Sequence, residues 1–228
     1  MAPERPDTQM RPVIRVLLAD DDPLVRTGLR ALLDGEPGLG VVAEAEDGAD
    51  AVAKARSQQP DVVVMDVRMP GVDGIRATEL ITRALPATRI LVVTTFENDG
   101  YVYDALRAGA SGFLLKRARP AELIRAVRVV AEGESLLFPA SLRDLASRSM
   151  AGTTRAGDAR TDRLSAREGE VLRQMAAGRS NAEIAEALVL GVQTVKTHVG
   201  AVLTKLGARD RTQAVIVAFE SGFVDPRD

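Results

Sequence analysis

The sequence predicts two domains, an α/β domain with a five-stranded, doubly wound parallel sheet and a smaller all-helical domain. Residues 13–133 alternate short apolar runs with segments of helical periodicity, which is typical of a parallel sheet with helices on both faces. Residues 163–228 instead contain four helical segments joined by tight turns. The length of 228 residues suffices for two modest domains of roughly 100–150 residues each.

Five apolar runs are the expected strands. The run VVVMD at residues 62–66 is rich in β-branched residues, as in a strand buried on both faces. We expect strands at 13–20, 40–46, 61–66, 89–95 and 112–116. We expect helices at 23–34, 48–57, 73–84, 98–108 and 119–133. In the first helix Val25, Leu29 and Leu33 recur at helical spacing, and Asp22 before a proline is typical of a helix start.

The segments outside these domains have a different composition. Residues 134–162 contain SRSMAGTTRAGDART, a small, polar and glycine-containing stretch that predicts a flexible linker. A short helix is expected near 139–148. Residues 1–12 are expected to form a disordered tail.

The helical domain carries clear start signals. Ser165 with Glu168, and Ser180 with Glu183, are capping boxes, in which each partner satisfies a backbone N–H of the other. The fourth helix is expected to begin at Asp210.

The third helix, residues 192–206, is amphipathic. Its predicted core stripe is Val192, Val195, Val199, Val202 and Leu206. Its opposite face carries Gln193, Lys196, Thr197, Gly200 and Thr204. A face that is polar but not bulky suits entry into the major groove of DNA.

Composition excludes several kinds of site. The chain has no cysteine, so disulfides and thiolate metal sites are excluded, and one histidine, His198, cannot form a histidine-rich metal site. No apolar run reaches the roughly 18 residues of a membrane span, and we expect a cytoplasmic protein without a membrane partner.

Residues 160–228 hold 10 basic and 9 acidic residues, a net charge of +1. A net charge this small does not indicate DNA binding. DNA binding must therefore be argued from motif and geometry.

Polar residues follow four of the predicted strands. They are Asp20 and Asp21 after the first, Asp66 after the third, Thr94 on the fourth and Lys116 after the fifth. In a parallel α/β sheet, ligands bind outside these carboxyl ends. Three carboxylates would repel one another, so we expect a divalent cation among them, and oxygen ligands favour Mg²⁺. A lysine and a hydroxyl beside the cation suit a tetrahedral anion such as a phosphoryl group.

The motifs ADDD, VVVMDVRMPGVDG, VVTTF and AGASGFLLK resemble those of a two-component response regulator receiver domain, which has a flavodoxin-like fold. The resemblance covers about residues 13–133 and implies that Asp66 is the phosphoacceptor. It also implies that Asp20, Asp21 and the backbone carbonyl of Arg68 hold Mg²⁺. Thr94 would be the switch hydroxyl, Lys116 the phosphate-pairing ammonium and Phe113 the aromatic residue that changes rotamer with Thr94.

We expect the carboxylate of Asp66 to be held in the open, because a phosphodonor must reach it. Many receiver domains have a proline in a cis bond after the lysine, whereas this chain has Arg117, so the path of that loop does not follow from the resemblance.

Residues 163–224 resemble the LuxR-type helix-turn-helix that follows receivers in the NarL/FixJ group. The resemblance implies that Lys196 and Thr197 reach base edges. The predicted DNA-binding residues are Gln193, Lys196, Thr197, Gly200, Lys205, Arg209 and Arg211, the last three near phosphates. Gly200 departs from relatives that carry a longer polar residue there, so their site preferences do not transfer.

The sequence therefore predicts a transcription factor, not an enzyme, that a sensor histidine kinase phosphorylates. The partners implied are double-stranded promoter DNA and a second copy, with RNA polymerase as a further candidate. The helices at 23–34 and 119–133 are the favoured contact with the second copy, and the outward residues of the last helix, near 212–221, are a second candidate contact. A receiver that acts by protein contacts without DNA is the alternative. A haloacid dehalogenase-type phosphohydrolase would need an aspartate where Arg68 stands, and a flavodoxin-like nucleotide-binding protein would need a phosphate loop in place of ADDDP.

Overall fold

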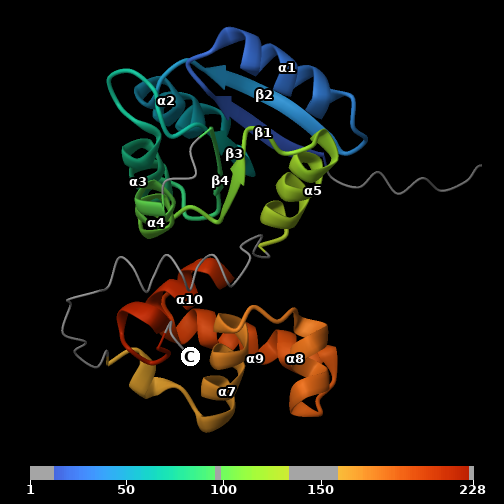
Figure 1. Ribbon diagram of the computed structural model, residues 1–228, viewed down its shortest axis with the longest axis vertical. Helices are drawn as coiled ribbons and strands as arrows, with labels where there is room; N and C mark the ends of the chain where they lie inside the picture. Colours follow the sequence, from blue (N-terminus) through green and yellow to red (C-terminus); the bar gives the residue numbers. More distant parts are fainter. Residues whose placement is uncertain (1–12, 96–98, 134–158, 226–228) are drawn as a thin grey trace, which may run out of the picture.

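The described part of the chain forms two domains (Figure 1). The structure, a computed structural model, describes residues 13–95, 99–133 and 159–225. An α/β domain ends at residue 133 and a helical domain begins at 159. The predicted tail, the predicted helix near 139–148 and most of the predicted linker lie outside the described residues, so the linker boundaries stay predictions.

The α/β domain has the predicted parallel sheet. Its strands are β1 (Ile14–Ala19), β2 (Leu39–Ala45), β3 (Val62–Met65), β4 (Arg89–Thr94) and β5 (Gly112–Leu115). The alternating helices are α1 (Pro23–Asp34), α2 (Gly48–Gln58), α3 (Gly74–Ala84), α4 (Asp99–Arg107) and α5 (Pro120–Ala131). The strand order is β2-β1-β3-β4-β5 and every pairing is parallel. The direction in which successive strands are added to the sheet therefore reverses between β1 and β3. Parallel sheets of this kind bind their ligands at such a point.

Two cores, one on each face, hold the sheet between its helices. On β3, Val62 and Val64 join the core with α1 and α5, whereas Val63 and Met65 join the core with α2, α3 and α4. Successive side chains of a strand point to opposite faces, so a strand covered on both sides must be apolar throughout. All four residues of β3 are buried, which confirms the prediction from the VVVM run.

Aspartate side chains begin three of these helices. Asp22 at α1, Asp47 at α2 and Asp73 at α3 each accept a first-turn backbone N–H, at 2.8, 2.8 and 2.7 Å. Such a cap stabilises a helix by about 1 kcal/mol. Asp22 is thus confirmed as a helix start.

The helical domain has the predicted four α-helices. A 3-10 helix (Thr161–Arg163) leads into α7 (Ala166–Ala176), α8 (Asn181–Leu188), α9 (Val192–Leu206) and α10 (Arg211–Glu220). Both capping boxes are confirmed, at Ser165 and at Ser180. Asp210 begins α10 as predicted, accepting the backbone N–H of Gln213 at 3.0 Å.

Helices α8 and α9 form the helix-turn-helix. Their axes meet at 107°, and α8 ends at Val189 in the left-handed conformation, with φ of 53°. Ile184 of α8 and Val195 and Val202 of α9 are fully buried and hold the pair against the domain core. No single helix among the described residues could cross a membrane, and only α8 and α9 counted together, despite their bend, reach the necessary length and apolarity.

The prediction that Val192 belongs to the core is wrong. Its side chain is 44% exposed, whereas Val195, Val202 and Leu206 are fully buried. Val192 is the first residue of α9, next to the exposed turn at Val189, so no preceding turn of the helix covers it.

Two glycines provide a matched test of the packing of the α/β domain. A Cβ atom on Gly74 would lie 1.8 Å from the backbone oxygen of Asp66, whereas one on Gly28, inside α1, would meet nothing within 4 Å. Both replacements by alanine reduce the freedom of the unfolded chain equally. We expect Gly28→Ala to raise the free energy of unfolding by up to about 1 kcal/mol. We expect Gly74→Ala to lower it, because backbone must shift, and chemical denaturation of both variants checks this. A Gly74→Ala variant as stable as the parent would contradict the close packing of α3 on β3.

Candidate functional site

The predicted carboxylates lie together at the carboxyl ends of β1 and β3. Carboxylate oxygens of Asp20, Asp21 and Asp66 all lie within 4.8 Å of one another. Asp20 and Asp66 are buried, at 3% and 6% exposed, while Asp21 is exposed. The neighbouring carboxyl ends of β1 and β3 therefore bring together two residues 46 positions apart in the chain, as the sequence predicts.

Lys116 bridges two of these carboxylates. Its Nζ lies 2.7 Å from Asp20 Oδ2 and 3.0 Å from Asp66 Oδ2, and the second oxygen of Asp66 accepts the backbone N–H of Val67 at 2.8 Å. Buried charges are tolerated where they are paired and hydrogen-bonded, as here. One ammonium against three carboxylates leaves an excess of two negative charges.

The expectation that Asp66 is held in the open is wrong. The residue is only 6% exposed, because Lys116 covers one oxygen and the loop from Val67 to α3 passes close to its backbone. The exposed member of the cluster is Asp21.

Burial and ion pairing have opposite effects on the pKa of Asp66, and also on the pKa of Lys116. Burial raises the pKa of Asp66 above its ordinary value, and the hydrogen bond from Lys116 only partly opposes this. Burial lowers the pKa of Lys116, but its hydrogen bonds to Asp20 and Asp66 outweigh burial, and the pKa is raised overall. Lys116 therefore stays cationic, and a further cation beside Asp66 would favour the ionised carboxylate.

The other predicted site residues surround this cluster. Thr94 ends β4, is buried, and its carbonyl accepts the backbone N–H of Lys116 at 2.8 Å. Phe113 is half-buried on the neighbouring β5. Arg68 follows in the loop two residues after Asp66, with an exposed side chain. The peptide bond between Lys116 and Arg117 is trans, as are all those described.

The donor set fits a hard divalent cation. The three clustered carboxylates offer only oxygen ligands, and no histidine or cysteine lies in the cluster. Oxygen ligands and an uncompensated negative charge favour Mg²⁺ or a cation of similar chemistry.

A second candidate site is the polar face of α9. Gln193, Lys196, Thr197, Gly200 and Thr204 are all exposed, as predicted for this face. The hydroxyls of Thr197 and Thr204 donate to backbone oxygens of their own helix one turn earlier, at 3.1 and 3.0 Å. Each threonine thus keeps a lone pair and a methyl group for an outside partner. The single histidine, His198, is half-buried beside this face.

The three flanking cations predicted near phosphates already have protein partners. Lys205 lies 2.6 Å from Glu168, and this bond lowers the pKa of Glu168. Arg211 donates to the backbone oxygen of Arg179. Arg209 is turned toward the α/β domain, donates to the backbone oxygens of Thr88 and Gly109, and has its pKa lowered by burial. The phosphate contacts of these three residues stay predictions, and that of Arg209 requires the domains to separate.

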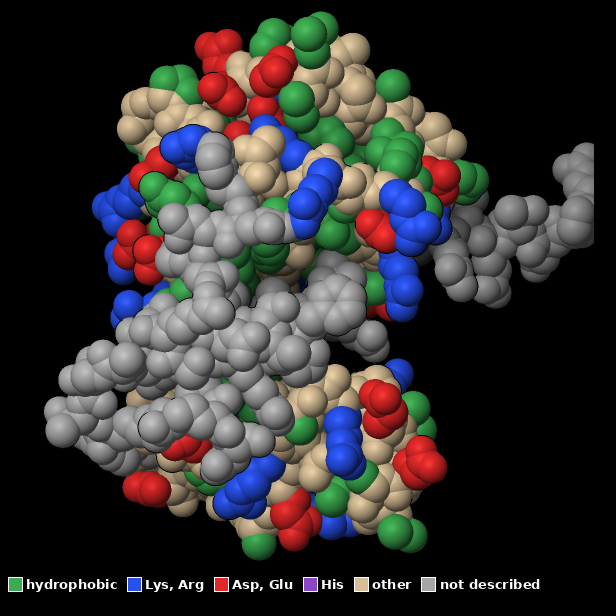
Figure 2. All heavy atoms as spheres, in the orientation of Figure 1, with side chains coloured by type: hydrophobic (Ala, Val, Ile, Leu, Met, Phe, Trp, Pro, Cys, Tyr) green, Lys and Arg blue, Asp and Glu red, His purple; other side chains and the backbone are tan. Residues whose placement is uncertain are grey.

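On the face in Figure 2, blue and red side chains are interspersed over the visible part of the helical domain, whereas several red side chains gather at the top of the α/β domain. This agrees with the near-balanced charge of the helical segment. A role in DNA binding must therefore be argued from the fold and the residues of the helical domain, not from a broad basic surface.

One polar cluster between the domains is not indicated by any sequence pattern. Ser111, just before β5, donates to the carboxylate of Asp210 at 2.7 Å, and Arg89 of β4 lies 3.8 Å from the same carboxylate. The sequence predicts for Asp210 only a role as a helix start. No local pattern reveals a partner 99 residues away.

Both domains match models of known protein families. Residues 16–128 match the model of the response regulator receiver domain, and residues 162–218 match that of the luxR family of bacterial regulatory proteins. Two relatives from Bacillus subtilis are similar over nearly their whole length. The transcriptional regulatory protein YxjL is 44% identical and LiaR is 40% identical, over 92% and 93% of this chain and 97% and 100% of theirs.

A solved structure of two RcsB dimers bound to two parallel DNAs is also similar. It is 27% identical, has a TM-score of 0.54, and the match covers 90% of this chain and 98% of that one. The similarity thus includes both domains of a protein seen on DNA.

The carboxylate cluster predicts a magnesium affinity that depends on Asp21. Asp21→Asn should weaken Mg²⁺ binding by about tenfold or more, because the cluster loses one anionic ligand. Asp22→Asn is the matched control, since asparagine still caps α1 and Asp22 is not in the cluster. Titration calorimetry with MgCl₂ measures both. Equal affinities for the parent and Asp21→Asn would exclude Asp21 as a ligand.

Proposed function

The chain belongs to the two-component response regulators with a LuxR-type DNA-binding domain, and from this we propose that phosphorylation of Asp66 controls its binding to DNA. It is a response regulator transcription factor, and this family is not enzymatic. The observation that carries the proposal is the cluster in which Lys116 contacts both Asp20 and Asp66.

Asp66 is the proposed nucleophile. A carboxylate oxygen attacks the phosphorus of a phosphohistidine in the partner kinase, and the O–P bond forms as the P–N bond breaks. The histidine nitrogen keeps the electron pair and takes up a proton. Burial excludes competing water, and Lys116, now 3.0 Å from Asp66, pairs with a phosphoryl oxygen.

Asp20, Asp21 and the backbone carbonyl of Arg68 are the proposed ligands of Mg²⁺. Bound there, the ion supplies the positive charge that lets one anion approach another. Thr94 is proposed to donate to the phosphoryl group, because it ends the strand beside β3 and its carbonyl is bonded to Lys116. Phe113, on the neighbouring strand, is proposed to change rotamer when Thr94 moves.

Helix α9 is the proposed reader of DNA bases. Gln193, Lys196, Thr197 and Gly200 are exposed on one face, and a slender polar helix of this kind fits the major groove. Lys205, Arg209 and Arg211 are the proposed phosphate contacts, each after it exchanges its present partner for DNA.

Phosphorylation is proposed to favour a dimer. Paired half-sites on DNA call for a two-fold protein, and the similarity to the RcsB dimers supports one. The proposed receiver contact is formed by α1 and α5. Leu24 of α1 is 81% exposed there, and an apolar groove of about 280 Å³ between the two helices lies beside Gly28. Arg125 and Val129 of α5 are further candidate members.

The proposed partners are a sensor histidine kinase, promoter DNA, a second copy and, on resemblance alone, RNA polymerase. The alternative is a receiver whose output domain acts through protein contacts. The exposed polar face of α9 favours DNA, and absence of DNA binding in every phosphorylation state would favour the alternative.

The phosphorylation site can be tested by intact mass. With MgCl₂ and a small phosphodonor such as acetyl phosphate, the parent should gain one phosphoryl group and Asp66→Asn none. Asp73→Asn is the matched control, because Asp73 also follows β3 but only caps α3. A normal gain in Asp66→Asn would disprove the assignment.

The reading helix can be tested on DNA fragments selected with the phosphorylated protein. Lys196→Ala should weaken binding by roughly 1–3 kcal/mol, the worth of one good base contact. Gly200→Lys should raise general affinity or change the preferred base, whereas Gly200→Ala should mainly stabilise α9, since its Cβ meets nothing within 4 Å. Lys54→Ala, which removes a cation far from α9, is the control.

Fluorescence anisotropy at several salt concentrations measures these affinities. If Lys196→Ala and Gly200→Lys both leave affinity and site preference unchanged, α9 does not lie in the groove, and the output domain acts through protein contacts.

A further inference from the structure

Arg26 of α1 lies beside the carboxylate cluster and contacts its backbone. Its Nη1 donates to the backbone oxygen of Asp20 at 2.6 Å, and its side chain is only 15% exposed. Asp20 is one of the three clustered carboxylate residues, and Asp21 follows it directly in the chain. The arginine therefore acts on the backbone that joins two members of the cluster.

The carbonyl of Asp20 lies just beyond the hydrogen-bond ladder of the sheet. Strand β1 ends at Ala19, whose carbonyl accepts the backbone N–H of Asp66 at 2.8 Å. The next carbonyl along the chain belongs to Asp20, a residue that is 3% exposed. A buried carbonyl needs a hydrogen-bond partner, and the guanidinium of Arg26 from the neighbouring helix supplies one.

The bond to this carbonyl also fixes the start of Asp21. The carbonyl of Asp20 and the N–H of Asp21 belong to one peptide unit, which is planar and rigid. A donor that holds the oxygen thereby sets the position from which the side chain of Asp21 leaves the backbone. Asp21 is the exposed member of the cluster, so burial does not restrict its side chain.

The remaining polar atoms of Asp20 are bonded as well. Its backbone N–H donates to the carbonyl of Ala45 on β2 at 3.1 Å. One carboxylate oxygen accepts the backbone N–H of Asp22 at 3.0 Å, and the other lies 2.7 Å from Lys116 Nζ. With Arg26 on its carbonyl, Asp20 is held by contacts from several segments of the chain. A ligand that is ordered in advance binds an ion without the entropic cost of ordering it.

Glu44 of β2 holds the guanidinium in its turn. Its Oε2 lies 3.4 Å from Arg26 Nε, while Nη1 of the same guanidinium reaches the Asp20 carbonyl. Arg30, one turn later on α1, donates to the other carboxylate oxygen of Glu44. A guanidinium is planar and presents its donors in a fixed geometry, so one partner on Nε fixes the direction of Nη1.

The charges of this network balance one another. Arg26 and Arg30 both pair with Glu44, and Arg30 also lies 3.4 Å from Asp34. Two cations and two carboxylates leave no net charge, so the network does not neutralise the excess negative charge of the cluster. The cluster therefore keeps its attraction for a cation while its backbone is held.

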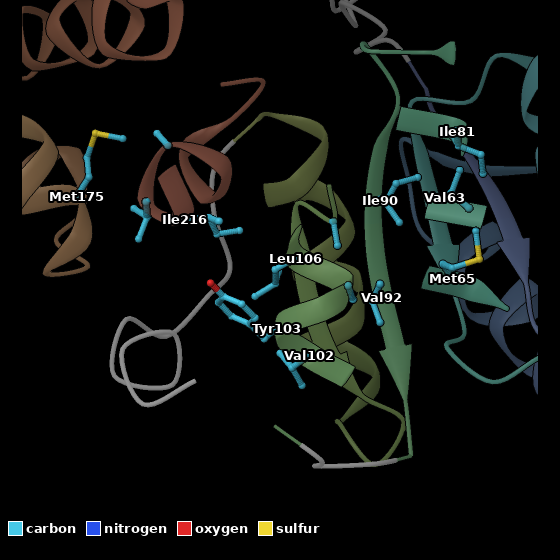
Figure 3. Close-up of a cluster of buried hydrophobic side chains, with 14 of the residues drawn as sticks. Val63, Met65, Ile81, Ile90, Val92, Val102, Tyr103, Leu106, Met175 and Ile216 are labelled. Carbon is cyan, nitrogen blue, oxygen red and sulfur yellow. The ribbon is translucent and has the colours of Figure 1, made fainter. Parts of the chain in front are cut away.

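Packing of the sheet does not by itself require these charges. On the face covered by α3 and α4, apolar side chains such as Val63, Met65 and Val92 fill the core (Figure 3). Leu18, the neighbour of Glu44 in the sheet, is likewise fully buried in the apolar core with α1 and α5. Glu44 instead places a charge beside this core, and the charge is paired with two arginines, one of which reaches the cluster.

We propose that Arg26 is a positioning residue for the metal site, which holds the peptide between Asp20 and Asp21 so that the carboxylate of Asp21 stays directed at the ion. Glu44 keeps the guanidinium in place. The proposal rests on the proposed function in that Mg²⁺ is the ion held by Asp20 and Asp21. Arg26 itself touches neither the ion nor the phosphoryl group.

Charge and positioning predict opposite results when Arg26 is removed. A cation beside a cation site repels the ion, so by charge alone the removal of Arg26 would strengthen Mg²⁺ binding. Loss of the bond to the Asp20 carbonyl would instead free the peptide that leads into Asp21, and binding would become weaker. The sign of the change in affinity therefore identifies the role.

Three variants of the full chain separate these effects. Arg26→Met keeps an apolar stem but removes the donors and the charge. Arg26→Lys keeps the charge but replaces the two-armed guanidinium with a single ammonium. Arg30→Ala is the matched control, because Arg30 also pairs with Glu44, while its other bonds go to Asp34 and to the backbone oxygen of Val41.

We expect Arg26→Met to weaken Mg²⁺ binding by about tenfold in titration calorimetry with MgCl₂, as for loss of a partner that orients a metal ligand. Arg26→Lys should lie between Arg26→Met and the parent, and Arg30→Ala should bind Mg²⁺ as the parent does. The MgCl₂ concentration that gives half the maximal rate of phosphoryl gain from acetyl phosphate should rise by the same factor as the dissociation constant. Chemical denaturation without Mg²⁺ shows whether each variant is folded.

Three results would contradict the positioning role. The first is equal or tighter Mg²⁺ binding in Arg26→Met. The second is binding in Arg30→Ala as weak as in Arg26→Met, because the loss would then come from the general packing of α1 on β2. The third is binding in Arg26→Lys equal to that of the parent, because charge alone predicts no change there. This third comparison also decides the question if Arg26→Met does not fold.

Asp21→Asn, measured in the same series, separates this proposal from the proposed function. If Asp21→Asn binds Mg²⁺ as the parent does, the metal assignment fails, and the role of Arg26 fails with it. If Asp21→Asn binds more weakly and Arg26→Met does not, the proposed function stands and Arg26 has no part in it.

Discussion

The contact of one ammonium with two buried carboxylates is the interaction on which the receiver site depends. Lys116 holds Asp20 and Asp66 at 2.7 and 3.0 Å, and these three residues follow three different strands. Without the lysine, two buried carboxylates would face each other with no positive charge between them, which is unfavourable. The sheet brings the three chain segments together, and the pairing makes their approach electrostatically tolerable. A cation and a phosphoryl group would redistribute this charge without requiring a new fold.

Much of this arrangement follows from local sequence. The VVVM run, the aspartate caps and the two capping boxes each act within a few residues, and the structure confirms them. The position of the carboxylate cluster follows equally well, since parallel strands share one carboxyl edge. Burial of Asp66 does not follow, because it depends on Lys116, 50 residues later, and on a loop that approaches closely only because residue 74 is glycine.

In the helical domain, too, local sequence predicts some features and not others. Periodicity predicts which face of α9 is polar, but not that Val192 lies beyond the core, because the end of a helix has no neighbour on one side. The resemblance to the LuxR-type pattern predicts that Lys205, Arg209 and Arg211 lie near phosphates. Lys205 is bonded to Glu168, 37 residues away, and Arg209 to receiver carbonyls 100 and 121 residues away. The side of a domain that meets another domain has no periodic signature in its own sequence.

The two bonds of Asp210 have a consequence for the speed of switching. The oxygen that begins α10 accepts a backbone N–H of the same helix, so this bond persists whether or not Ser111 is present. Separation of the domains therefore does not require the first turn of α10 to unwind. Rigid-body motions of domains take microseconds to milliseconds, far faster than a cell needs to make or degrade a regulator. On the function proposed above, the response time would then be set by the arrival and hydrolysis of the phosphoryl group, and not by refolding of α10.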